Sequence, residues 1–208
     1  MPLKYLIGII LTGGQVFKNM NLQEYFIVQA LKETNIKHAS YVAKHDNGSC
    51  VINNTHLPLI FPMDRLEKIQ SLSKEKSLDY CFLGKITEER EWVLEYATQD
   101  SVVEESLFGR WARFKFNFHR KYHEILCRSR FALTPTGDFP WSYRFFEAIM
   151  CHCIPIFKPN DPDIFKQDYI YYKTDEDHVY NREITEQNYQ VFLNSDHFLK
   201  NVAVDNIS

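Results

Sequence analysis

The sequence has little net charge, no long hydrophobic run and no internal repeat or low-complexity tract. Its 24 basic and 27 acidic residues leave a formal net charge of −3, so nothing draws the whole chain toward nucleic acid or an acidic membrane surface. Any anion-binding site must therefore be local. What the sequence does contain is 208 residues, 45% of them hydrophobic, which is enough for a globular protein with a core.

Paired cysteines are also absent. The five cysteines are scattered, odd in number and without a Cys-x-x-Cys pair or a Cys/His block at zinc spacing; they are Cys50, Cys81, Cys127, Cys151 and Cys153. This pattern favours reduced thiols in an intracellular protein, and we expect a cytoplasmic location.

The N-terminal apolar run, residues 5–11, is too short to span a bilayer and is not followed by a small-residue cleavage site. We expect it to form a buried first strand, and we expect no transmembrane segment. Helical spacing of apolar residues then predicts a helix over residues 22–34, with Asn21 as its N-cap. Short strands are expected at 39–42 and 57–61. The charge-rich segment 63–80 is the expected seam between two units.

The rest of the chain alternates between predicted strands and helices. The predicted strands are 80–83, 131–133, 154–157 and 170–172, and the predicted helices are 88–98, 113–128, 143–150 and 186–199. Such alternation indicates an α/β domain with a parallel sheet.

The loop between one such strand and the next helix is a candidate binding site. In open parallel sheets, ligands bind beyond the carboxyl ends of the strands, and residues 134–143 occupy that position. Gly137 allows close approach of the backbone to a ligand, and the amide groups that open the next helix favour an anion such as phosphate. Arg144 is unfavourable for the helix dipole in the first turn, so an anion in front of it would explain its presence.

Glu147 lies three residues after Arg144 and on the same helical face. If Arg144 faces phosphate, the carboxylate of Glu147 can accept hydrogen bonds from the sugar hydroxyls of a nucleotide. The alternative is that the two side chains pair with each other on a solvated face of the helix. Spacing alone leaves both interpretations open.

The stretch YHEILCRSRFALTPTGDFPWSYRFFEAIMCHCIPIF, residues 122–157, resembles the C-terminal signature of the exostosin family of glycosyltransferases. The shared pattern is a Y-x-x-x-L-x-x-S helix, an F-x-L-x-P-x-G strand and loop, an arginine-led helix and a Cys-Ile-Pro strand. The matching positions are Tyr122, Leu126, Ser129, Phe131, Leu133, Pro135, Gly137, Arg144, Glu147, Ala148, Cys153, Ile154 and Pro155. A weaker extension runs from residue 78 to residue 199.

The resemblance implies a GT-B-like α/β fold, in which two Rossmann-like domains face each other and the C-terminal one holds a nucleotide-sugar donor. Residues 77–208 would be this domain, with a parallel sheet, and residues 1–76 a reduced N-terminal α/β portion on the acceptor side. The expected donor-binding residues are Lys85, Arg90, Gly137, Asp138, Ser142, Arg144 and Glu147. The resemblance places Arg144 at the diphosphate, Glu147 at the ribose, and Lys85 and Arg90 near the phosphates.

Two features depart from the family pattern. His152 stands where a glycine commonly precedes the Cys-Ile-Pro run, and the portion before residue 77 is far shorter than a usual N-terminal Rossmann domain. The family also implies inverting transfer, in which a base deprotonates the acceptor hydroxyl as it attacks the anomeric carbon. The candidate bases, which spacing does not separate, are Asp46, Asp138, Asp100, His45 and His38.

Three further motifs have simpler interpretations. Asp161-Pro162-Asp163 resembles the D-x-D sequence of metal-dependent transferases, but an arginine clamp would make a metal redundant, so we expect a structural turn and no metal cofactor. Cys151-His152-Cys153 is expected to supply core thiols, because neighbouring residues on a strand point to opposite faces. The basic segment 113–123 is expected to be an amphipathic helix, and no nucleic-acid partner is expected.

Three functional hypotheses follow. The first is a glycosyltransferase that moves a hexosyl or pentosyl group from a nucleoside-diphosphate sugar, expected to be a UDP-sugar, to a hydroxyl of a glycan or glycoprotein. The second is a nucleotide-sugar-binding module without catalysis of its own, since the short N-terminal portion leaves little room for an acceptor site; forming a homodimer is one way to complete the site. The third is an α/β scaffold in which Arg144 and Glu147 are only structural.

Overall fold

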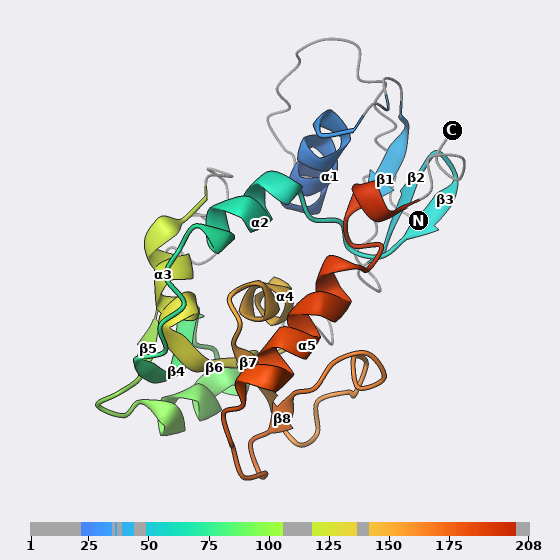
Figure 1. The fold of residues 1–208 in the computed structure, drawn as a ribbon. Coiled ribbons are helices and arrows are strands. Elements are labelled where there is room, and N and C mark those ends of the chain that lie inside the picture. The colour runs from blue at the N-terminus through green and yellow to red at the C-terminus, as the bar shows by residue number, and fades with distance from the viewer. Residues whose placement is uncertain are drawn as a thin grey trace. The chain divides into compact units, whose positions relative to one another are not determined.

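The structure is a computed structural model that describes residues 22–34, 36, 39–43, 49–105, 118–136 and 142–202. These residues divide into two compact units (Figure 1). One unit contains the described residues of Met1–Leu66 and Leu193–Ser208, and the other is Glu67–Phe192. The predicted first strand lies outside the described residues. Within the described ranges, no helix is long and apolar enough to cross a membrane.

The first unit contains helices and a small antiparallel sheet. Its elements are α1 (Leu22–Lys32), β1 (Tyr41–Ala43), β2 (Cys50–Ile52), β3 (Thr55–Leu57), the start of α2 (Met63–Gln70) and the 3₁₀ helix η4 (Leu199–Asn201). The sheet order is β1-β2-β3. Asn53 and Asn54 connect β2 to β3 with φ angles of 46° and 65°, as a tight two-residue hairpin requires. Ile27, Ile52 and Leu199 share one core, so the segment around η4 completes this unit.

The second unit is a parallel α/β domain. Its elements are β4 (Leu78–Gly84), the 3₁₀ helix η2 (Glu88–Tyr96), β5 (Val102–Glu105), α3 (Arg120–Arg128), β6 (Ser129–Leu133), α4 (Tyr143–Met150), β7 (Ile154–Phe157), β8 (Tyr172–Lys173) and α5 (Arg182–Leu193). The strands lie in the order β5-β4-β6-β7-β8, and every neighbouring pair is parallel. This arrangement confirms the predicted Rossmann-like, GT-B-like α/β fold class.

Both faces of the five-stranded sheet are covered. On one face, Phe82 of β4 and Ile156 of β7 pack in a cluster with Trp92 of η2. Phe157 alternates with Ile156 and packs against Phe145 of α4 on the other face, where the ring centroids are 5.6 Å apart. Helix α3 packs against β4 and β6, and α4 against β6 and β7 (Figure 1). Burial on both sides explains why β7 is entirely apolar.

Several observed elements agree with the predicted ones, and others differ. Helix α4 and strand β7 have the predicted bounds, and α3 covers residues 120–128 of the predicted helix 113–128, whereas residues 118 and 119 are not helical. The predicted helix 88–98 is a 3₁₀ helix, and the predicted helix 186–199 is α5, which begins and ends earlier.

One strand was missed and one strand prediction fails, each for an identifiable reason. Strand β5 has no counterpart among the predicted elements because it is an edge strand whose valines are only half-buried and whose glutamates are exposed, so it carries no apolar pattern. The predicted strand 57–61 is wrong beyond Leu57. Residues 59–61 are buried but belong to no strand, and the Phe61 amide donates a 2.8 Å hydrogen bond to the His197 carbonyl.

Candidate functional site

The carboxyl ends of β4 and β6 form the candidate site. The two strands are parallel neighbours, so they end at the same edge of the sheet. Strand β4 leads through residues 85–87 into η2, and β6 leads through a loop into α4. Ligands of open α/β sheets bind at such an edge, where loops and helix N-termini meet.

Arg144 is held at this edge from the first turn of α4. Its Nη2 atom donates a 2.7 Å hydrogen bond to the Leu83 carbonyl, and its Cζ atom lies 4.5 Å from the centre of the Phe82 ring. The side chain is buried, with 8% of its surface exposed. A carbonyl oxygen and an aromatic face both stabilise a guanidinium group, so Arg144 is fixed on the end of β4.

Gly84 makes this position possible. A Cβ atom at residue 84 would lie 2.6 Å from Nη2 of Arg144 and 3.2 Å from Cζ of Phe82. The first contact is too short for any real Cβ atom, so a larger residue at position 84 would require the guanidinium group to shift from its observed position. Sequence reasoning missed Gly84; the available signal was a glycine at the end of a predicted strand, which indicates close approach of another group.

One hydrogen-bond donor of the Arg144 guanidinium group is unpaired. Its Nε atom is buried and has no hydrogen-bond partner among the described residues. Ser142, the N-cap of α4, makes no side-chain capping bond. Its buried Oγ atom has no hydrogen-bond partner among the residues that the structure describes. Buried polar groups are normally paired, so these two groups at the start of one helix are candidate ligand-binding groups.

Arg90 connects the two loops at this edge. Its Nε atom donates a 3.2 Å hydrogen bond to the Thr136 carbonyl, after β6, and its Nη1 atom donates a 3.3 Å bond to the Lys85 carbonyl, after β4. Lys85 itself is exposed. The structure therefore brings together three predicted basic residues, Lys85, Arg90 and Arg144, from three different elements.

Glu147 lies one turn after Arg144 and is also buried, with 8% exposed. Its Oε2 atom accepts a 2.7 Å hydrogen bond from the hydroxyl group of Tyr122 on α3. Burial raises the pKa of Tyr122 well above its ordinary value, and the charge of Glu147 raises it further, so the phenol remains a donor. Because Arg144 and Glu147 are both buried, the alternative of a pair on a solvated helix face is wrong.

Of the remaining candidate residues, the structure describes only Asp100. Gly137, Asp138, Asp46, His45 and His38 lie outside the described residues. Asp100 is exposed, and its carbonyl accepts a 2.7 Å hydrogen bond from the Asp79 amide at the amino end of β4. It therefore lies at the opposite edge of the sheet, which disfavours it as the base.

The Asp161-Pro162-Asp163 sequence forms a turn held by its own side chains. Asp161 accepts a 2.9 Å hydrogen bond from the Lys158 amide, and an Asp163 oxygen lies 3.0 Å from Nζ of Lys173. Hydrogen bonds from Lys173 and Tyr171 lower the pKa of Asp163. In the described ranges, no group of three or more His, Cys, Asp or Glu side chains could hold a metal ion.

The cysteines are buried thiols, as predicted. All five are free and buried. Cys153 donates a 2.8 Å hydrogen bond to the Leu126 carbonyl, and Nζ of Lys76 donates to the carbonyls of Cys127 and Cys151 at 3.0 and 2.9 Å. The predicted strand geometry for Cys151 and His152 is wrong, because these residues form the turn after α4.

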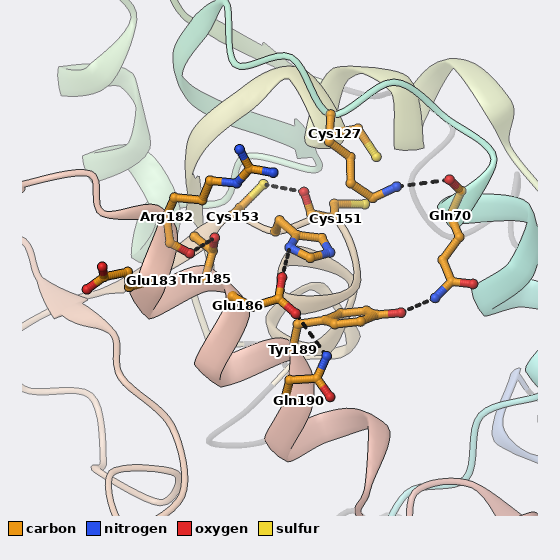
Figure 2. A network of polar contacts seen from close by, with 12 residues as sticks. Gln70, Cys127, Cys151, Cys153, Arg182, Glu183, Thr185, Glu186, Tyr189 and Gln190 are labelled. Atoms are coloured by element: carbon orange, nitrogen blue, oxygen red, sulfur yellow. Dashed lines mark hydrogen bonds and ion pairs between the residues drawn. The ribbon is translucent and has the colours of Figure 1, made fainter.

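His152 adopts the backbone conformation that a glycine favours, with φ of 56°. Its ring stacks on Tyr189 of α5 at 4.4 Å, and its Nδ1 atom lies 3.7 Å from Oε2 of Glu186. Burial lowers the pKa of His152 to about 4, although Glu186 raises it, so the ring is neutral at pH 7. The Tyr189 hydroxyl accepts a hydrogen bond from Gln70, and this network ties α5 to the end of α2 (Figure 2).

Comparison with known proteins gives one family. The family model described as the exostosin GT47 domain matches residues 66–182, which is more than half of the chain. The match includes β4, β6 and α4 and therefore Lys85, Arg90, Arg144 and Glu147. No curated protein matches the chain significantly.

Proposed function

The chain belongs to the exostosin GT47 family of glycosyltransferases, and on that premise we propose that it transfers a sugar from a nucleoside-diphosphate donor, expected to be a UDP-sugar, to a hydroxyl of a glycan or glycoprotein. The observation that carries this proposal is the unpaired Nε atom of Arg144, buried at the carboxyl ends of β4 and β6. A diphosphate offers several acceptor oxygens and two or more negative charges, which the planar fork of a guanidinium group can bind through two parallel hydrogen bonds.

Charge at the site supports the assignment. Lys85 and Arg90 lie at the same edge as Arg144, and the N-terminus of α4 adds amide groups and the Ser142 hydroxyl. Glu88, Glu89 and Glu91 follow β4 at the same edge, so the support comes from the positions of the three cations and not from the net charge of the edge. Such a site would hold the donor before reaction and stabilise the diphosphate as it leaves.

The proposed reaction is a single inverting displacement. The acceptor oxygen attacks the anomeric carbon from the side opposite the diphosphate, the bond from that carbon to the diphosphate oxygen breaks, and a base removes the acceptor proton. The leaving group keeps the electron pair, and its charge is balanced by Arg144, Lys85 and Arg90, so the proposal requires no metal. Asp46 and Asp138 are the proposed bases. Glu147, oriented by Tyr122, is proposed to accept hydrogen bonds from the ribose.

A second candidate function is nucleotide-sugar binding without catalysis. One observation favours it: the only sheet in the described part of the first unit has three short antiparallel strands, whereas a second Rossmann-like domain would provide a parallel sheet. In that case an acceptor site would require another domain or another chain, such as the partner subunit of a homodimer.

Calorimetric titration with UDP-, GDP- and TDP-sugars, with Mg²⁺ and with EDTA, tests the proposal. We expect a UDP-sugar to bind with the same affinity in both conditions. Release of UDP in the presence of a glycan acceptor then separates a transferase from a binding module. Failure of all three classes of donor to bind would overturn the proposed function.

A further inference from the structure

The two helices that begin at the candidate site share an unusual feature. Helix η2 follows β4 and has Thr87 as its N-cap, and α4 follows β6 and has Ser142 as its N-cap. Neither side chain makes a capping hydrogen bond. Both hydroxyl oxygens are buried and have no hydrogen-bond partner among the described residues. An N-cap hydroxyl normally accepts a hydrogen bond from its own helix, so both groups are available to something else.

Thr87 is tied to the same edge as Arg144. The Arg90 amide donates a 2.8 Å hydrogen bond to the Thr87 carbonyl, and the Arg90 guanidinium group bonds the carbonyls of Lys85 and Thr136. The start of η2 is therefore fixed against the loop that leads to α4. Arg144, more than nine-tenths buried, contributes its unpaired Nε atom from the other helix.

Burying an unpaired hydroxyl or guanidinium N–H group is costly, so unpaired groups rarely gather at one place. Here three of them, on Thr87, Ser142 and Arg144, lie at the starts of the two helices that follow adjacent parallel strands. A fourth unpaired donor, Nε1 of Trp92 on η2, belongs to a residue of the apolar cluster around Phe82 and is not counted with them. One diphosphate offers enough acceptor oxygens to pair with all three.

We propose that Thr87, in the segment between β4 and η2, is a phosphate-binding residue. Its hydroxyl group donates a hydrogen bond to the diphosphate of the sugar donor. The inference rests on the proposed function and adds a residue that the sequence did not indicate. The first turn of η2 carries three exposed glutamates, Glu88, Glu89 and Glu91, which disfavour an anion. The contribution of this helix is therefore the neutral hydroxyl group of Thr87 and not the helix dipole.

The alternative is that the Thr87 hydroxyl is unpaired only because its methyl group packs in the core. The two explanations predict different results for Thr87→Val, which keeps the shape and removes the hydroxyl. If the hydroxyl is merely buried, the variant is at least as stable as the natural protein and binds UDP equally well. If it binds phosphate, the variant is equally stable without ligand but binds UDP more weakly.

The experiment is calorimetry with UDP, inorganic pyrophosphate and uridine on the full chain. We expect Thr87→Val to weaken UDP and pyrophosphate binding about tenfold and to leave uridine binding unchanged. Thr87→Ser, which keeps the hydroxyl group, should restore the affinity for UDP and pyrophosphate. Thr185→Val is the matched control: Thr185 is buried, and its hydroxyl donates a 2.8 Å hydrogen bond to the Arg182 carbonyl (Figure 2), so the change should lower stability without changing UDP binding.

The outcomes are distinguishable. UDP binding by the natural protein together with unchanged UDP and pyrophosphate affinity in Thr87→Val would overturn this inference and leave the proposed function in place. Absence of both UDP and pyrophosphate binding in the natural protein would overturn both.

Discussion

The hydroxyl group of Tyr122 donates a 2.7 Å hydrogen bond to Oε2 of Glu147, and this contact joins α3 to α4 beside the candidate site. Burial and the charge of Glu147 keep the pKa of Tyr122 high, so the phenol remains protonated at any physiological pH. The bond fixes the orientation of a buried carboxylate. In the proposed site, that carboxylate faces the ribose.

Replacing Tyr122 with Phe tests this positioning role. The change leaves a buried carboxylate oxygen without its donor, so we expect the free energy of unfolding to fall by about 1–3 kcal/mol. We also expect UDP to bind several-fold more weakly and the preference for UDP over 2′,3′-dideoxy-UDP to shrink, as measured by calorimetry. If Tyr122 is purely structural, its replacement lowers stability but leaves that preference at its natural value. This result would rule out the positioning role.

Replacing Gly84 with Ala tests the contact between β4 and Arg144. The added methyl group would lie 2.6 Å from Nη2 of Arg144, so the guanidinium group must move off the Leu83 carbonyl. We expect UDP affinity to fall about tenfold or more, because a displaced charge no longer faces the diphosphate. In an Arg144→Met background the same Gly84→Ala change should have little further effect on binding. Additive losses would show that Gly84 acts through another group.

His152 predicts a dependence of stability on pH. Its pKa is about 4 in the folded chain and has the ordinary value of 6.5 in the unfolded one. Between these values the unfolded state binds more protons, so the free energy of unfolding falls as the pH is lowered from 6.5 to 4. After allowance for solvent screening, we expect a loss of about 1–2 kcal/mol.

The matched variant for this test is His152→Gly, which removes the titrating ring and suits the φ angle of 56°. Urea unfolding at several pH values should show the natural protein losing more stability than the variant between pH 6.5 and pH 4. If the two curves stay parallel over that range, His152 does not titrate with a lowered pKa.

Sequence reasoning located the elements that carry strong local patterns. Helix α4 and strand β7 have the predicted bounds because an apolar helix between a turn and a buried strand leaves few alternatives. The segment 57–61, predicted as a strand, shows the limit of such patterns: four of its five residues are buried, but apolar composition reports burial and not strand pairing.

The site was only partly predictable for a similar reason. The helical spacing of Arg144 and Glu147 placed them on one face, but spacing does not show whether that face is solvated or buried. The partners of Arg144, Leu83 and Gly84, come from a strand some sixty positions earlier in the chain. Such a contact is set by the parallel pairing of β4 with β6, which no local pattern encodes. The roles of Gly137, Asp138 and Asp46 stay predictions.

The central claim is that Arg144 binds the diphosphate of a nucleotide-sugar donor. The most direct test is calorimetric titration of a UDP-sugar into the natural protein and into Arg144→Met. Arg182→Met is the control, because Arg182 is an exposed arginine. Circular dichroism checks that each variant folds. We expect Arg144→Met to fold and to bind the donor about thirtyfold more weakly or worse, while Arg182→Met binds as the natural protein does. Natural affinity in a folded Arg144→Met protein would contradict the account.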